Sequence, residues 1–175
     1  MASRPLFAPW RMDYIRSLEN PDAGKCFLCE AGKEGLSESE KRERLVLWTT
    51  PLSLVCVNRY PYTNGHLLIS PRAHKAELDE LSDEELLDVQ KQTTAAIQLQ
   101  KRASSPQGFN IGINLGRCAG AGLPGHVHQH VVPRWGGDTN FMTVVGNIRV
   151  VPQAMTQLYE ELLRVKAQLD LSTAT

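Results

Sequence analysis

The chain has 175 residues, which is enough for one domain with a buried core and too few for two domains of ordinary size. Lysine and arginine together number 19, as do aspartate and glutamate, so the net charge is zero and gives no support to nucleic-acid binding. Hydrophobic residues make up 42% of the chain, yet no stretch approaches the roughly 20 apolar residues of a membrane span. Because the first residues also lack the apolar core of a secretory signal, we expect a cytoplasmic protein with neither a nucleic-acid nor a membrane partner.

The first 25 residues are rich in proline, arginine and aromatic residues and show weak periodicity. This composition is typical of an N-terminal arm that packs on the domain or on a partner subunit, and a frayed end is the alternative. Residues 32–44 are polar and charged and are predicted to form a loop.

The segment Cys26-Phe27-Leu28-Cys29 has the C-x-x-C spacing that lets two thiolates of one turn hold a single zinc ion. A redox dithiol and a pair of free cysteines are the alternatives, and the chain lacks the βαβ pattern that accompanies the former. A closed zinc site needs four ligands, so two more must come from elsewhere in the chain. In a reducing compartment we expect no structural disulfide.

Three short apolar runs predict an antiparallel meander, and they span residues 45–48, 52–58 and 66–70. A capping box at Ser82 and Glu85 then starts a helix that is predicted to run to about Arg102, because apolar residues recur at steps of three and four. Residues 109–115 resume a strand, and a last amphipathic helix follows Val151-Pro152.

A glycine-rich loop over residues 116–125 leads into a strand-like run in which His126, His128 and His130 alternate. Side chains of a strand alternate between faces, so the three imidazoles are expected to project from one face, each about 7 Å from the next. A neutral imidazole is a nucleophile near pH 7, and it can also bind a metal ion or transfer protons. Glycines let backbone amides approach a phosphate, where a histidine could displace a leaving group and form a phosphoramidate. A solvent-exposed polar strand and a flexible connector are the alternatives.

The run His126-Val127-His128-Gln129-His130-Val131-Val132 resembles the signature of the histidine triad family, His-x-His-x-His with apolar residues between the histidines, from which Gln129 departs. The similarity covers roughly residues 25–140 and includes residues 57–59, residues 64–71, Asn114 and Pro133-Arg134. Residues 8–14 and 133–142 further resemble the microbial branch typified by diadenosine tetraphosphate phosphorylases.

The resemblance implies catalytic and nucleotide-binding roles. His128 is expected to attack the α-phosphorus of a nucleotide and to carry the nucleotidyl group, while His130 contacts the phosphate or helps to protonate the leaving group. Asn58 is expected to bind the ribose hydroxyls, and Asn114 to bind phosphate or to position the nucleophile. Turn or strand-end chemistry is the alternative for both asparagines.

The resemblance also bears on phosphate binding and on zinc. Many family members carry a glutamine and a small polar residue just before the triad, where this chain has Gly120-Ala121-Gly122-Leu123-Pro124. The backbone amides of Gly120, Ala121 and Gly122 would then hold the phosphates. Zinc-bearing relatives imply the structural zinc ligands Cys26, Cys29, His74 and His126.

For the fold, we expect a single α+β domain of the histidine triad type, with an antiparallel sheet of about five strands, a long helix after the third strand and a C-terminal helix. The expected parts are an arm over residues 1–25, the domain over 26–150 and the C-terminal helix over 151–175, and the resemblance implies a homodimer. The expected function is cleavage of a dinucleoside polyphosphate such as diadenosine tetraphosphate through a nucleotidyl-His128 intermediate, with phosphate or water as the acceptor. Hydrolysis of adenosine phosphoramidates or other nucleoside monophosphate conjugates is the alternative within enzymes, and a non-catalytic nucleotide-binding scaffold is the alternative outside them.

Overall fold

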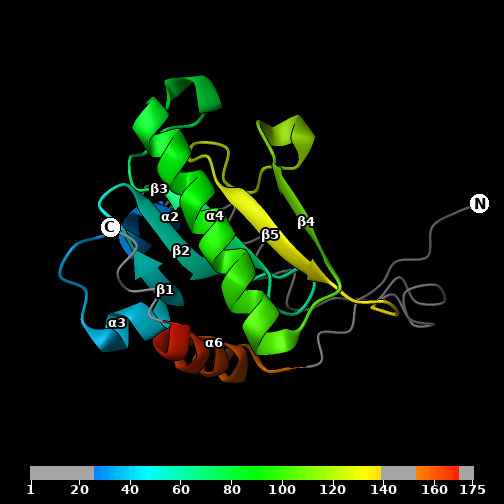
Figure 1. The fold of residues 1–175 in the computed structure, drawn as a ribbon. Helices are drawn as coiled ribbons and strands as arrows, with labels where there is room; N and C mark the ends of the chain where they lie inside the picture. Colours follow the sequence, from blue (N-terminus) through cyan, green and yellow to red (C-terminus); the bar gives the residue numbers. More distant parts are fainter. Residues whose placement is uncertain (1–25, 139–152, 170–175) are drawn as a thin grey trace, which may run out of the picture.

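One antiparallel sheet forms the centre of the computed structural model, which describes residues 26–138 and 153–169 (Figure 1). Its strand order is β1-β2-β3-β5-β4, so β1 and β4 are the two edges. The strands are β1 (Val46–Thr49), β2 (Ser53–Val57), β3 (Leu67–Pro71), β4 (Gly108–Ile113) and β5 (Gln129–Arg134). This arrangement confirms the predicted α+β fold with about five strands.

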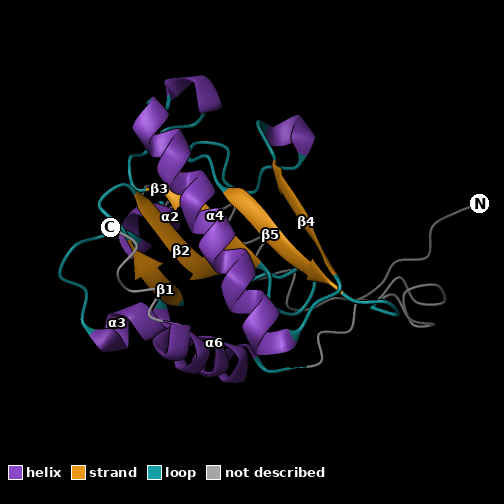
Figure 2. Cartoon of the chain, in the orientation of Figure 1, coloured by secondary structure: helices purple, strands orange, loops and turns teal. Residues whose placement is uncertain are grey.

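The first three strands form the predicted meander, in which β2 pairs with β3 from Ser53 opposite Pro71 to Val57 opposite Leu67. Every residue of β2 and β3 is buried. Helices cover both faces of these strands: α4 (Asp83–Ser104) and α6 (Met155–Leu169) lie on one side and the short α2 (Phe27–Ala31) on the other (Figures 1 and 2). Because both faces are covered, the strands are almost continuously apolar instead of alternating.

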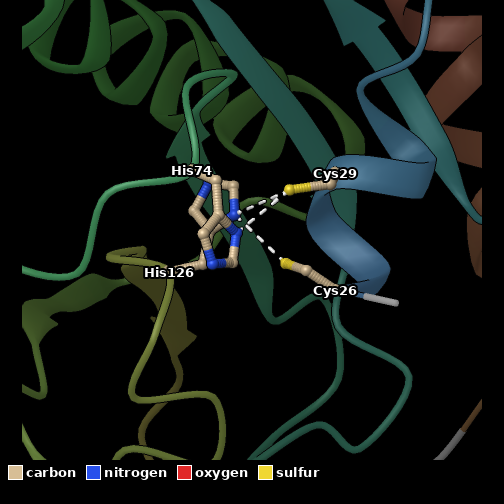
Figure 3. A group of neighbouring side chains, drawn as sticks. All are labelled: Cys26, Cys29, His74 and His126. Carbon is tan, nitrogen blue, oxygen red and sulfur yellow. Dashed lines mark hydrogen bonds between the residues drawn. The ribbon is translucent and has the colours of Figure 1, made fainter. Parts of the chain in front are cut away.

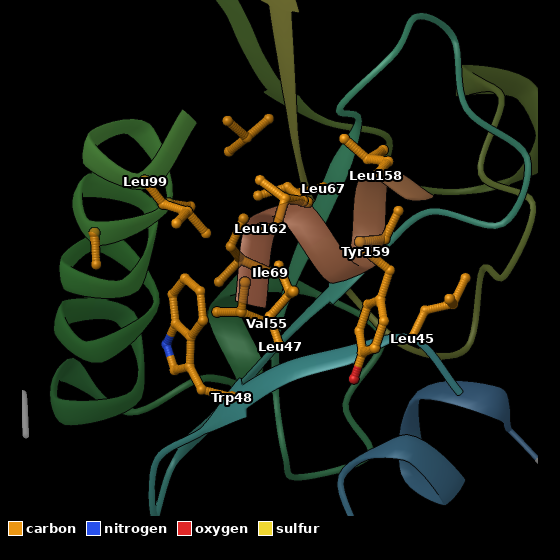
Figure 4. Close-up of a cluster of buried hydrophobic side chains, with 14 of the residues drawn as sticks. Leu45, Leu47, Trp48, Val55, Leu67, Ile69, Leu99, Leu158, Tyr159 and Leu162 are labelled. Carbon is orange, nitrogen blue, oxygen red and sulfur yellow. The ribbon is translucent and has the colours of Figure 1, made fainter. Parts of the chain in front are cut away.

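Two apolar layers hold these elements together. The larger layer lies between the sheet and the helices α4 and α6, and it includes Trp48, Leu99 and Leu162 (Figure 4). Burial of one such leucine stabilises the fold by about 1.5–3 kcal/mol. The smaller layer packs Leu28 and Ala31 of α2 against the first three strands. The α2 segment is therefore anchored by its own apolar contacts.

The long helix α4 begins at the predicted capping box. The hydroxyl of Ser82 accepts from the backbone N–H of Glu85, and the Glu85 carboxylate accepts from the backbone N–H of Ser82 at 2.8 Å. The helix ends at Ser104, two residues beyond the predicted end near Arg102, and Ser105, which caps it, has a left-handed backbone with φ +47°. None of the described helices, not even the long α4, has the run of apolar residues that a membrane span requires.

The C-terminal helix α6 is present as predicted and packs on the domain, with Leu158, Tyr159 and Leu162 in the larger apolar layer. The Tyr159 hydroxyl donates to the carbonyl of Val46 at 2.7 Å and so connects α6 to β1. Val151-Pro152, predicted to precede this helix, and the predicted arm over residues 1–25 lie outside the described residues.

The predicted loop over residues 32–44 is wrong in its second half, where the helix α3 (Glu38–Glu43) forms. Ser37 and Glu40 make a complete capping box, and Lys41 pairs with Glu38 one turn away at 2.7 Å. This helix has no buried residue, so hydrophobic periodicity could not reveal it. The Ser-x-x-Glu spacing was the available signal.

The predicted histidine strand is shorter than expected, because β5 begins only at Gln129. Before that residue, the N–H of Val127 donates at 2.7 Å to the carbonyl of Lys75, which lies in the loop after β3. Two of the three alternating histidines thus lie on an extended lead-in to the strand. The described loop between β4 and β5 also contains a short 3₁₀ turn, η2 (Arg117–Ala119).

Candidate active site and metal centre

The three alternating histidines share one face of the sheet, the face that α2 covers. Val131 of β5 lies in the apolar layer under α4, so its neighbour His130 points to the opposite side. The ring of His128 lies 5.0 Å from that of His130, measured between centroids. His126 is fully buried and reaches Cys26 at the start of α2. The predicted alternation therefore continues through the lead-in to β5.

His128 has the contacts of a neutral nucleophile. Its Nδ1 donates to the carbonyl oxygen of His126 over 2.8 Å. The proton is thereby held on Nδ1, and the lone pair is on Nε2. Burial lowers the pKa of His128 below its ordinary value, although the carbonyl contact acts in the opposite direction. The ring is therefore neutral near pH 7, which nucleophilic attack requires.

A fourth histidine contacts the triad. His66, the residue before β3, is fully buried, and its Nε2 lies 2.9 Å from Nδ1 of His130. The Tyr62 ring stacks on His66 with 4.8 Å between ring centroids. Sequence reasoning missed this contact, because 64 residues separate the two histidines and no local pattern places the turn before β3 beside β5.

Two cysteines and two histidines converge in a second cluster, which Figure 3 shows. Cys26 caps α2 and Cys29 lies within it, while His74 follows β3 and His126 precedes β5. Nδ1 of His126 lies 3.1 Å from Sγ of Cys26 and 3.4 Å from Sγ of Cys29. Nδ1 of His74 lies 3.2 Å from Sγ of Cys29, and the four ligand atoms all lie within 4.8 Å of one another.

These four residues fit a tetrahedral zinc ion. Zn–S bonds of about 2.3 Å and Zn–N bonds of about 2.1 Å place sulfur and nitrogen about 3.6 Å apart in a tetrahedron. The sulfur–nitrogen distances of 3.1 to 3.4 Å are close to that spacing. Nε2 of His126 donates to the carbonyl of Pro71 at 2.9 Å, which orients the lone pair of Nδ1 toward the cysteines. Burial raises the pKa of the Cys26 thiol to about 11, so a cation is needed to hold it as a thiolate near pH 7.

The two predicted nucleotide-binding asparagines lie at different ends of the site. Asn58, directly after β2, has its amide nitrogen 3.1 Å from Nδ1 of His66, which connects it through His66 to His130. Asn114 follows β4, and its amide nitrogen lies 3.9 Å from the position that a Cβ on Gly120 would occupy. Their roles toward a ribose and a phosphate stay predictions.

Comparison with known proteins places this geometry in a family. A family model described as HIT domain matches residues 39–137, more than half of the chain. The chain belongs to the histidine triad (HIT) family. It is 38% identical to AP-4-A phosphorylase of Mycobacterium tuberculosis over 151 residues, which are 86% of this chain and 77% of that relative. It is 36% identical to the asymmetrical bis(5'-nucleosyl)-tetraphosphatase of Schizosaccharomyces pombe over 51% of this chain and 48% of that relative.

A solved HIT structure is also similar. The Zn-bound histidine triad family protein from Mycobacterium smegmatis superposes with a TM-score of 0.55 at 29% identity, covering 72% of this chain and 86% of that one. That protein binds zinc, and this chain has a cluster of two cysteines and two histidines that fits the same metal.

Two of the three backbone amides that were predicted to bind phosphate form hydrogen bonds within the glycine loop. The N–H of Gly120 donates to the carbonyl of Arg117 at 3.0 Å, and the N–H of Ala121 donates to that of Gly116 at 3.2 Å. Gly116 and Gly120 have φ of +75° and +92°, which favour glycine over other residues. Of the three predicted amides, Gly122 is the one whose N–H has no such backbone contact among the described residues.

Proposed function

We propose that the protein cleaves dinucleoside polyphosphates, with diadenosine tetraphosphate as the representative substrate, by transferring a nucleotidyl group to His128 and then to phosphate or water. The proposal depends on one observation, the His128 ring, whose Nδ1 is engaged by the His126 carbonyl and whose Nε2 carries the lone pair beside His130. The names of the relatives, a phosphorylase and a tetraphosphatase, support this substrate class.

The chemistry consists of two displacements at one phosphorus. In the first, Nε2 of His128 bonds to the α-phosphorus and the bond to the bridging oxygen breaks, so ATP leaves and an adenylyl group stays on the histidine. In the second, an oxygen of phosphate or water attacks the same phosphorus and the N–P bond breaks. The acceptor's proton passes to solvent, and ADP or AMP is released. Asn58 binds the ribose, while Asn114 and the amide of Gly122 face the phosphates.

The test is the identity of the products. With diadenosine tetraphosphate and phosphate, we expect ADP plus ATP if phosphate is the acceptor and AMP plus ATP if water is, and chromatography separates the two. Label from ¹⁸O-water appears in AMP only in the second case. Binding of the nucleotide without any product would contradict the proposal and would favour a nucleotide-binding scaffold.

Zinc is the ion that we assign to Cys26, Cys29, His74 and His126. Bound there by four protein ligands, it supplies no open coordination position for a substrate and acts as a structural link. The ligands come from α2, from the loop after β3 and from the lead-in to β5, so the ion connects the N-terminal segment to the catalytic histidines.

A homodimer is part of the proposal, formed through β4 and the adjoining side of α4. β4 is an edge strand, and Asn110, Ile111 and Gly112 in it are exposed, Ile111 to 45%. Unpaired edge strands with exposed apolar residues readily pair with another chain. Leu86 and Leu87 of α4 are also exposed, so apolar surface is available on both elements.

An Ile111→Lys variant is expected to convert the dimer into a monomer, because an unpaired lysine would be buried where two edges meet. Sedimentation velocity distinguishes 19.5 kDa from twice that mass, about 39 kDa. Ser39→Lys, which introduces the same residue at an exposed position of α3 beside β1, the opposite edge of the sheet, is the control that should stay dimeric. A monomeric wild-type protein at micromolar concentration would contradict this part of the proposal.

A further inference from the structure

A chain of hydrogen bonds runs from the turn between β2 and β3 to the triad. It begins at Asn58, whose side-chain oxygen accepts from the backbone N–H of Tyr60 at 2.9 Å. This contact determines which end of the amide is oxygen, so the nitrogen end faces His66. The nitrogen lies 3.1 Å from Nδ1 of His66 and 3.4 Å from Nε2, so the shorter contact is to Nδ1.

The direction of donation at His66 follows from its partners. Nδ1 receives the backbone N–H of Tyr62 at 3.1 Å as well as the amide nitrogen of Asn58. A nitrogen that faces two donors must be an acceptor, so Nδ1 carries no proton. Burial, together with the neighbouring His130 and His128, lowers the pKa of His66 to about 3. The ring is thus neutral near pH 7, and its single proton is on Nε2.

The same reasoning extends to His130. Nε2 of His66 lies 2.9 Å from Nδ1 of His130, so the Nε2–H of His66 donates and Nδ1 of His130 accepts. Burial, with a smaller contribution from His128, lowers the pKa of His130 to about 4. The neutral His130 ring therefore has its proton on Nε2. That atom is buried, and it has no hydrogen-bond partner among the described residues.

We propose that His66 is a positioning residue that fixes His130 as the Nε2–H tautomer, so that the third triad histidine meets the substrate as a hydrogen-bond donor to a phosphate oxygen. The inference rests on the proposed function for the identity of the substrate, whereas the hydrogen-bond direction rests on geometry alone. His128 and His130 then have opposite tautomers: His128 is protonated on Nδ1 and attacks with Nε2, while His130 donates from Nε2.

This assignment separates two roles that the sequence left open for His130. A neutral imidazole N–H stabilises negative charge that develops on a phosphate oxygen, but it is a poor source of a full proton. His130 accordingly contributes a hydrogen bond and does not transfer a proton. The polyphosphate product departs as an anion, so the balance of the first displacement needs no proton from His130.

The test combines NMR with kinetics. Long-range ¹H–¹⁵N spectra of ¹⁵N-histidine-labelled protein report the tautomer of each ring, and we expect Nε2–H at His66 and His130 and Nδ1–H at His128. In His66→Phe, which keeps a stacked ring but no donor, His130 should become a mixture of tautomers. Turnover should fall about 10- to 100-fold in kcat with little change in KM, because the lost interaction is strongest in the transition state.

Two further variants sharpen the interpretation. His66→Gln retains an N–H that can reach Nδ1 of His130, so it should recover part of the lost kcat. Cys56→Ala shortens another fully buried side chain of the meander and controls for general destabilisation, so it should leave the His130 tautomer and kcat unchanged. An Nδ1–H tautomer at His130 in the wild-type protein would overturn the inference, even if neither His66 variant folds. The expected tautomers without any nucleotide cleavage would instead overturn the proposed function and leave the hydrogen-bond direction standing.

Discussion

A His128→Ala variant is expected to lose nucleotide cleavage by roughly 10⁴-fold or more while it keeps its fold and its metal content. No other ring in the triad can replace it as the nucleophile. His126 uses Nδ1 toward the cysteines and Nε2 toward the carbonyl of Pro71, and His130 has its proton on Nε2. Turnover measured by chromatography, together with circular dichroism and metal analysis, checks the expectation.

A substitution at Gln129, the residue after His128, is the matched control for this variant. Gln129 is the polar departure within the family signature, and its side chain lies on the opposite face from His128. Gln129→Val should therefore keep both β5 and turnover. Near-normal cleavage by a folded His128→Ala protein would show that the nucleophile is another group.

Joint replacement of Cys26 and Cys29 by serine is expected to remove about one zinc ion per chain and to lower the free energy of unfolding by about 3 kcal/mol or more. In a chain of this size such a loss lowers Tm by about 6 to 12 °C. The structural reason is that the cluster links α2, the loop after β3 and the lead-in to β5. Elemental analysis and thermal unfolding of the purified protein measure both quantities.

The same double variant should also reduce turnover, because the metal cluster and the nucleophile are connected through His126. The side chain of His126 belongs to the metal cluster, while its carbonyl accepts from Nδ1 of His128. Release of that side chain loosens the carbonyl that holds the nucleophile in the correct tautomer. Cys118→Ser is the control, because Cys118 is exposed and lies outside the cluster. Full metal content in the double variant would refute the zinc assignment.

Much of the fold could be predicted because the sequence contains local signals for it. The meander follows from apolar runs and turn residues, and α4 follows from the Ser82–Glu85 capping box. The helix α3 was not predicted, because it is solvent-exposed and its charged residues resemble those of a loop. Its capping box is a short motif that hydrophobic periodicity does not detect.

The site separates into local and long-range parts in the same way. The spacing of Cys26 and Cys29 and the alternation of His126, His128 and His130 are properties of a few neighbouring residues, so the sequence by itself determined the donor groups and the face that they share. Only the tertiary structure decided that His66 directs the tautomer of His130 and that two amides of the glycine loop are already used within the loop. The physical reason is that hydrogen-bond partners depend on which distant segments the sheet brings together, and the pairing of β3 with β5 joins residues sixty or more positions apart.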